Sequence, residues 1–304
     1  QVHVFEPNGS EAGRLELIRL VLERHSDNND LISYPWPNVK AMLRSRRSAR
    51  TALDALRERP DELAISNARE RTIDDPGDSR FEALLDILSE QWSSTPEERF
   101  VIVAGDAPTI DMLNVALPRY FPDLADGAIA SLKRPPAATE ETARDIQQMH
   151  ESVAPFISGD AKVLILGDWV QAGLNLHHAS RNIIFYSLPW NPQAIDQLIG
   201  RIDRLRRNGL RKGRRKQHFG HVRIWRLVMR HSPEETISWA MDAIRIFERP
   251  LPQVSEEDMS VINFHLGRLA RNEKVSQSLD TLAELASVWD TRGLKSGLEV
   301  FDPV

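Results

Sequence analysis

The sequence predicts an α/β fold in which a parallel sheet is covered by flanking helices, with further helical segments at both ends of the chain. Stretches of strand length alternate with stretches of helical length between about residues 80 and 230. Two strand stretches, VLIL at 163–166 and NIIFY at 182–186, are almost continuously apolar. Such runs suit strands buried on both faces, and the alternation is typical of parallel sheets.

The individual elements follow from hydrophobic periodicity and from the start and stop signals of helices. Helices are expected at 80–91, 109–120, 139–156 and 192–206, and strands at 100–104, 128–132, 162–166, 182–188 and 222–228. Parallel sheets bind ligands in the loops that follow the carboxyl ends of their strands. We therefore look for functional residues in those loops.

The first 78 residues are polar and have a helical pattern. Leu15, Ile18 and Leu22 recur at helical spacing, and residues 39–59 are rich in Arg, Ala and Leu. The cluster DDPGD at 74–78 is a loop signal and a candidate boundary.

From residue 232 onward the pattern is helical again, and Trp239, Ile244 and Phe247 are expected to pack inward. The chain is therefore predicted to have three parts. These are a helical segment at 1–78, an α/β unit at 79–231 and a helical extension at 232–304.

Composition describes an ordinary globular chain of 304 residues, 41% of them hydrophobic. Without cysteine the chain has no disulfide, no thiolate zinc site and no thiol nucleophile, which fits a reducing, cytoplasmic location. No apolar run reaches the roughly 18 residues of a membrane span, and no signal peptide is predicted. The first residue, Gln1, suggests a fragment or a processed chain.

Charge is distributed unevenly along the chain. The formal net charge is -5, yet ten Lys or Arg residues and a single acid, Asp203, lie between Arg201 and Arg223. Net charge averages over such a distribution, so this basic segment is where phosphates are expected to bind.

The most informative motif is Q-x-x-G-R-x-x-R, formed by Gln197, Gly200, Arg201 and Arg204 on an expected helix. The two arginines are three residues apart and therefore share a face of the helix. Arginine is always charged and matches phosphate geometry, so the pair suits stabilisation of charge in phosphoryl transfer. Taken alone, such a pair also fits a solvated face or structural ion pairs with acids.

The segment 167–207 resembles motifs five and six of superfamily-two helicases, particularly the Swi/Snf branch. The residues Trp190-Asn-Pro-Gln193 match the strand-to-helix joint of that branch. Together, LPWNP at 188–192 and IGRIDR at 199–204 are similar to the bacterial RapA-type subgroup. The resemblance covers about residues 80–250 and implies the second RecA-like lobe of an ATP-dependent motor.

The resemblance also implies roles for the motif residues. Arg204 corresponds to the arginine finger, Arg201 to a second contact with the nucleotide phosphates, and Gln197 to a residue that orders the cleft. The resemblance also implies that Gly200 and the turn with Gly173 and Asn175 lie beside the bound nucleotide. Upstream of this turn, DWVQ at 168–171 departs from the family pattern of a hydroxyl followed by small residues. A simple turn after a strand is the alternative for Gly173 and Asn175.

Nucleic acid is expected along the basic segment. The candidate contacts are Arg206, Arg207, Arg211, Lys212, Arg214, Arg215 and Lys216. Binding through these residues would weaken steeply as salt rises. A solvated surface loop is the equally weighted alternative.

Two other features point to structure rather than chemistry. His177 and His178 are adjacent, but no carboxylate or third histidine lies at ligand spacing, so no metal site is predicted. The ring of Trp190 is expected to pack in the lobe core or hinge rather than to stack on a base.

Half of an ATP site is missing from the sequence. No G-x-x-x-x-G-K-[ST] loop and no D-E-x-H strand end occurs, so ATP with Mg²⁺ would be held by a first lobe in the same polypeptide or in another.

The prediction is a second motor lobe of a translocase on double-stranded DNA, with this segment alone inactive. The alternatives are a degenerate lobe that binds nucleic acid or protein in a larger complex and, less favoured, an RNA helicase. Transcription recycling and phage defence both fit the resemblance.

Overall fold

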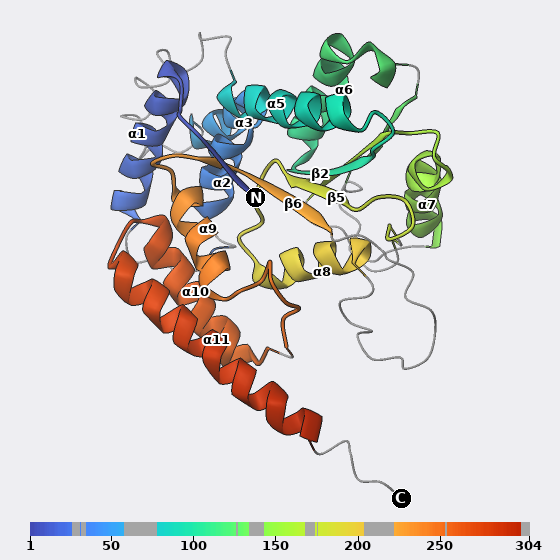
Figure 1. The fold of residues 1–304 in the computed structure, drawn as a ribbon. Coiled ribbons are helices and arrows are strands. Elements are labelled where there is room, and N and C mark those ends of the chain that lie inside the picture. The colour runs from blue at the N-terminus through green and yellow to red at the C-terminus, as the bar shows by residue number, and fades with distance from the viewer. Residues whose placement is uncertain are drawn as a thin grey trace, which may run out of the picture.

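The computed structural model describes residues 1–25, 31, 35–57, 78–125, 127–133, 143–167, 174, 176–203, 222–252 and 254–298. These residues form one six-stranded sheet with helices against both faces (Figure 1). None of the helices in these ranges combines the length and apolarity needed to cross a membrane.

The sheet is parallel at every strand pair, with the order β1-β6-β5-β2-β4-β3. Its strands are β1 (Val2–Phe5), β2 (Phe100–Gly105), β3 (Ile129–Leu132), β4 (Val163–Gly167), β5 (Asn182–Phe185) and β6 (Arg223–Met229). Every residue of β2, β4 and β5 is buried, as the apolar runs predict. The predicted α/β class with a parallel sheet is confirmed.

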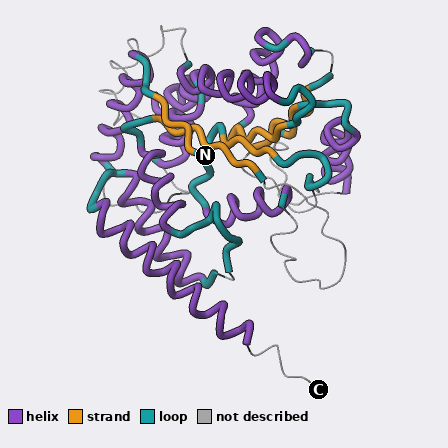
Figure 2. The backbone as a smooth tube through the Cα atoms, viewed as in Figure 1, coloured by secondary structure: helices purple, strands orange, loops and turns teal. Residues whose placement is uncertain are grey.

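Helices pack against both faces of the sheet (Figure 2). They are α1 (Gly9–Arg24), α2 (Trp36–Arg44), α3 (Arg46–Arg57), α5 (Ser79–Ser94), α6 (Ala107–Tyr120), α7 (Ala143–Ser158), α8 (Pro192–Ile202), α9 (Pro233–Ala243), α10 (Glu256–Ala270) and α11 (Val275–Leu298). A short 3-10 helix, η2 (Pro122–Leu124), follows α6.

Alternate residues of each strand enter different cores, because successive side chains of a strand point to opposite faces. Phe100 and Ile102 of β2 pack with α5 and α6, whereas Val101 and Val103 pack in the larger core. The larger core also takes side chains from α1, α2, α7, α8, α9 and α10. It therefore joins residues of all three parts that the sequence predicts.

A buried ion pair also ties distant parts of the chain together. The Arg80 guanidinium, at the start of α5, contacts the Glu234 carboxylate at the start of α9, and both side chains are buried. Arg80 also donates a hydrogen bond to the Leu227 carbonyl oxygen at 3.2 Å. Burial raises the pKa of the Glu234 carboxyl above its ordinary value, and the positive charge of Arg80 acts in the opposite direction.

Four sequence expectations differ from the structure. The helix expected at 192–206 ends at Ile202, where Asp203 is the C-cap. Strand β1 is not anticipated, because four residues are too few for a clear pattern; it pairs with β6 at the sheet edge. Strand β5 ends at Phe185 rather than at residue 188, because the Tyr186 N–H donates to the Ile184 carbonyl oxygen of its own strand instead of to β2. The Trp239 side chain is 44% exposed, so its predicted packing is wrong, whereas Ile244 is buried and Phe247 packs against the core.

Candidate functional site

Helix α8 begins where the sequence places a strong start signal. The Asn191 side chain accepts hydrogen bonds from the backbone N–H groups of Gln193 and Ala194, and Pro192 occupies the first turn. Asn at the cap satisfies free N–H groups, and Pro is pre-organised for the first helical position. The W-N-P-Q motif is therefore the capping structure of α8.

One face of α8 is buried and the other carries the predicted site. Ile195, Leu198 and Ile199 enter the larger core, whereas Gln197 is exposed and Arg201 is half-buried. Gln197 and Arg201 are four residues apart and so lie on one face of the helix. Among the described residues, neither side chain makes a hydrogen bond or an ion pair. The structural ion pair that the sequence left open for Arg201 is thus not formed within this part of the chain.

The last turn of α8 contacts the turn that follows β4. The Leu176 backbone N–H donates to the Arg201 carbonyl oxygen at 3.2 Å. Leu174 and Leu176 are buried in the larger core, which holds this turn against the helix. The structure therefore places Leu176 beside the end of α8, next to Arg201.

Several predicted site residues fall outside the described ranges. They are Gly173, Asn175, Arg204, Arg206, Arg207, Arg211, Lys212, Arg214, Arg215 and Lys216. Gly200 lies within α8, one residue before Arg201. Of the predicted nucleotide-side residues, the structure thus places Gln197, Gly200 and Arg201.

A hollow of about 800 Å³ lies at the start of α8. Trp190, Asn191 and Gln193 line it on one side, and Lys40 and Arg44 of α2 line it on another. It adjoins Ser187 and Leu188, which follow β5 at the carboxyl edge of the sheet. This edge is where parallel sheets bind ligands.

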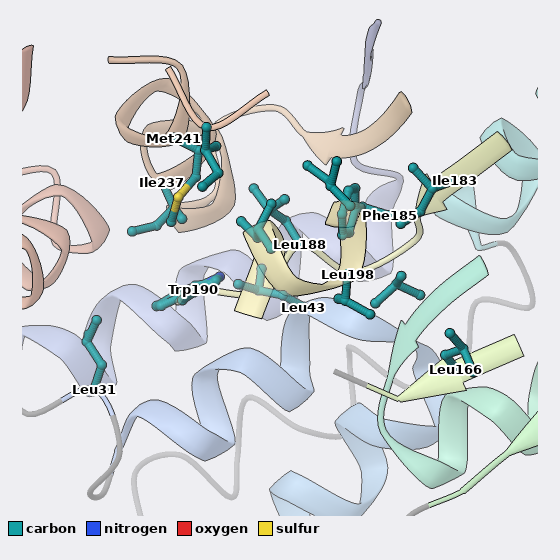
Figure 3. Close-up of a cluster of buried hydrophobic side chains, with 14 of the residues drawn as sticks. Leu31, Leu43, Leu166, Ile183, Phe185, Leu188, Trp190, Leu198, Ile237 and Met241 are labelled. Carbon is teal, nitrogen blue, oxygen red and sulfur yellow. The ribbon is translucent and has the colours of Figure 1, made fainter. Parts of the chain in front are cut away.

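Trp190 packs in the core beside this hollow. Its side chain is only 5% exposed and belongs to the cluster of buried hydrophobic side chains in Figure 3. Its ring meets that of Trp36 edge to face at 5.9 Å between centroids. The Lys40 ammonium lies 5.2 Å from the centroid of the Trp190 ring. The predicted core packing of Trp190 is confirmed.

Arg44 is a site residue that the sequence pattern does not reveal. Its guanidinium contacts Asp106 and Ser187, each at 3.3 Å, and so bridges the ends of β2 and β5. The backbone of Gly105 makes room for it, because a Cβ there would lie 2.6 Å from the Arg44 Nε atom. In sequence Arg44 is one of several arginines between residues 44 and 50, and nothing local distinguishes it.

A second cluster of polar side chains joins α2 and α3 to the same edge. The Ser48 hydroxyl donates to the Asp106 carboxylate at 2.7 Å, and the Ser45 and Ser48 hydroxyls lie 3.0 and 2.9 Å from that of Thr109. All three hydroxyl side chains are buried. This network fixes the N-terminal segment against the start of α6.

His177 and His178 lie side by side with ring centroids 3.6 Å apart. They border a hollow of about 510 Å³ that Arg99, Arg181 and Arg223 also line. Among the residues that the structure describes, no group of three or more His, Cys, Asp or Glu side chains is arranged to hold a metal ion.

Comparison with known sequences gives one family and one relative. Residues 136–206 match the family model described as "Helicase conserved C-terminal domain". The chain is 30% identical over 138 residues to the "Uncharacterized ATP-dependent helicase YqhH" of Bacillus subtilis (strain 168). The match covers 42% of this chain and spans only 23% of that relative.

Solved structures with a similar arrangement include the C-terminal part of the Fun30 ATPase domain, at 16% identity and a TM-score of 0.46. That match covers 90% of this chain and 98% of the other. The Sulfolobus solfataricus SWI2/SNF2 ATPase core in complex with dsDNA matches at 12% identity and a TM-score of 0.47, over 90% of this chain and 49% of that one. The region from α7 through α8, which holds Gln197 and Arg201, is thus the part of the chain that is similar by sequence to helicase C-terminal domains.

Proposed function

We propose that this chain is the second motor lobe of an ATP-dependent translocase of the Swi/Snf branch and acts on double-stranded DNA. Arg201 and Arg204 would contact the phosphates of ATP held by a first lobe, with Arg204 as the arginine finger. Gln197 would order the cleft between the lobes. The observation that carries this proposal is the exposed face of α8, where Gln197 and Arg201 have no partner among the described residues.

The chemistry of phosphoryl transfer explains why such a face is useful. Charge spreads over the oxygens of the transferring phosphoryl group, and fixed cationic donors stabilise it. The buried face of α8 holds the helix rigidly, so the Arg201 guanidinium reaches a ligand without reorganisation of the backbone. Magnesium would be bound by the first lobe, since the D-E-x-H strand end that holds it in such motors does not occur in this sequence.

Duplex DNA is the proposed nucleic-acid partner. The basic segment 206–216 supplies the charge for backbone phosphates. Lys40 and Arg44 line the hollow at the start of α8 together with Glu234 and Glu256, and Arg44 is paired with Asp106. About 12 Å of helix separates Gln193 at this hollow from Arg201, at 1.5 Å per residue. A single rigid helix would therefore connect the DNA side with the ATP side.

Several finer assignments belong to the same proposal. The motif sequence supports membership of the bacterial RapA-type subgroup, and the lack of cysteine fits a cytoplasmic protein. The first lobe would lie in the same polypeptide or in a partner, and this segment alone would not hydrolyse ATP.

The test uses the complete protein that contains the first lobe. We expect duplex DNA to stimulate its ATP hydrolysis, and Arg204→Ala and Arg201→Ala to lower turnover by about 10³-fold while DNA affinity stays nearly unchanged. Arg119→Ala, which removes an exposed arginine from α6, is the matched control and should leave turnover unaltered.

The other outcomes are equally informative. Unchanged turnover in Arg204→Ala would refute the finger assignment. A complete protein that binds DNA but hydrolyses no ATP would favour the degenerate lobe. Stimulation by RNA instead of duplex DNA would favour an RNA helicase.

A further inference from the structure

A third hollow, of about 830 Å³, lies away from α8. Helix α1 forms one wall, the start of α9 forms the opposite wall, and the turn between α10 and α11 closes one end. Figure 1 shows α1 and α9 on the side of the molecule opposite α6 and α7. The hollow shares no lining residue with the one at the start of α8. We call it the α1–α9 groove.

The floor of the α1–α9 groove is apolar. Leu15 and Pro233 line it and are half-buried, so they offer accessible apolar surface. Ile18, Leu22 and Leu269 also line it but are buried. Trp239 of α9 stands on the wall with 44% of its side chain exposed. A tryptophan held beside an apolar floor is the residue type that most often dominates the energy of a protein interface. Single exposed apolar residues are ordinary on protein surfaces, but Trp239 lies beside the apolar lining of this hollow.

The rim of the groove is acidic. Four carboxylates line it, from Glu16, Glu23, Glu235 and Glu273, against two guanidinium groups, from Arg19 and Arg271. Arg19 pairs with Glu16 at 2.9 Å and with Glu23 at 3.8 Å, and Arg271 pairs with Glu273 at 2.9 Å. Glu235 forms no ion pair with a described residue; it accepts only the His231 backbone N–H at 2.8 Å. An excess of negative charge therefore surrounds the apolar floor.

From the apolar floor, the exposed tryptophan and the acidic rim, we propose that the α1–α9 groove docks a basic peptide segment of another protein, with a large apolar side chain as its anchor. The anchor fills the floor against Trp239, and flanking Lys or Arg side chains face Glu23 and Glu235. Complementary charge guides the encounter and excludes acidic segments. The groove is separate from the proposed ATP and DNA surfaces, so it would tether the motor to a protein partner without blocking them.

The test is a selection from a displayed library of random peptides of about twelve residues against the purified chain. We expect enriched sequences to combine one large apolar residue with neighbouring Lys or Arg. Synthetic copies of the enriched peptides are then measured by fluorescence anisotropy. Trp239→Ala should weaken binding about tenfold or more.

Two further variants separate the contributions. Glu23→Gln combined with Glu235→Gln should weaken binding and reduce its dependence on salt, because screened charge pairs are lost. Tyr120→Ala removes an exposed aromatic ring from α6 and should leave binding unchanged. Thermal unfolding of each variant confirms that it is folded.

The selection can overturn the proposal in three ways. Enrichment of apolar peptides without basic residues would show an apolar site that does not select charge. Peptides that bind Trp239→Ala as tightly as the parent would place binding elsewhere. Absence of any enriched peptide would show that the groove docks no peptide segment of this kind.

Discussion

The backbone N–H of Leu176 donates a hydrogen bond to the carbonyl oxygen of Arg201, across 3.2 Å. The last carbonyl groups of a helix have no partner within the helix, and here the turn after β4 satisfies one of them. The buried side chains of Leu174 and Leu176 hold that turn against the core. The end of α8 and the turn after β4 therefore keep a fixed relation, which positions the face that carries Arg201.

Arg201 and Gln197 are expected to contribute little to folding. Both side chains lack partners among the described residues, so Arg201→Ala and Gln197→Ala should each change the free energy of unfolding by less than about 0.5 kcal/mol. Ile199→Ala, on the buried face of the same helix, should cost about 2–5 kcal/mol. Urea unfolding of the three variants measures the contrast. A large loss in Arg201→Ala would assign that side chain a structural role.

The pair Arg80 and Glu234 should be sensitive to loss of either partner. Glu234→Ala leaves the Arg80 charge buried without its carboxylate, and we expect a loss of about 3–5 kcal/mol in the free energy of unfolding. Replacing both residues, as Arg80→Met with Glu234→Leu, should recover much of that loss because no buried charge remains. Urea unfolding of the single and double variants checks this. A double variant as unstable as the single one would contradict it.

Gly105 should not tolerate a side chain. Its φ is 96°, and a Cβ would meet the Arg44 Nε atom at 2.6 Å, so Gly105→Ala should destabilise the protein by about 1–3 kcal/mol. Gly9→Ala is the matched control, because nothing lies within 4 Å of a Cβ at that position. Thermal unfolding of the two variants should separate them clearly. Equal melting temperatures would mean that Arg44 moves aside without cost.

Two tryptophans should differ in their effect on stability. Trp190 is 5% exposed and packs against Trp36, so Trp190→Ala should cost about 3–5 kcal/mol. Trp239 is 44% exposed, and Trp239→Ala should cost under about 1 kcal/mol. Denaturant unfolding followed by far-ultraviolet circular dichroism measures both. Similar losses would show that Trp239 also packs in the core.

Acid should destabilise the protein through His265. Burial lowers the pKa of this imidazole below its ordinary value of 6.5, and Arg268 adds to the effect. The unfolded chain therefore binds the proton more tightly, so stability is retained above pH 6.5 and falls as pH drops below that value. Unfolding measured at several pH values should show this slope. His265→Leu should flatten it, and an unchanged slope in that variant would exclude His265 as the cause.

Local pattern in the sequence determined the class of the fold and most of its elements. Apolar runs such as 163–166 and the Asn-Pro start of α8 act within a few residues, so periodicity and capping rules reveal them. The spacing of Gln197, Gly200 and Arg201 likewise defines one helix face from the amino-acid order alone. The candidate site is therefore encoded largely by neighbouring residues.

Contacts between residues far apart in sequence were decided only by the tertiary structure. Val2–Phe5 becomes a strand because β6, more than two hundred residues later, offers an edge to pair with. Arg44 becomes part of the carboxyl edge because Gly105, Asp106 and Ser187 converge on it. Helical periodicity predicts that Trp239 packs inward, yet its ring lies in the α1–α9 groove and is 44% exposed. Such outcomes depend on which surfaces meet after the chain folds, and no local pattern encodes that meeting.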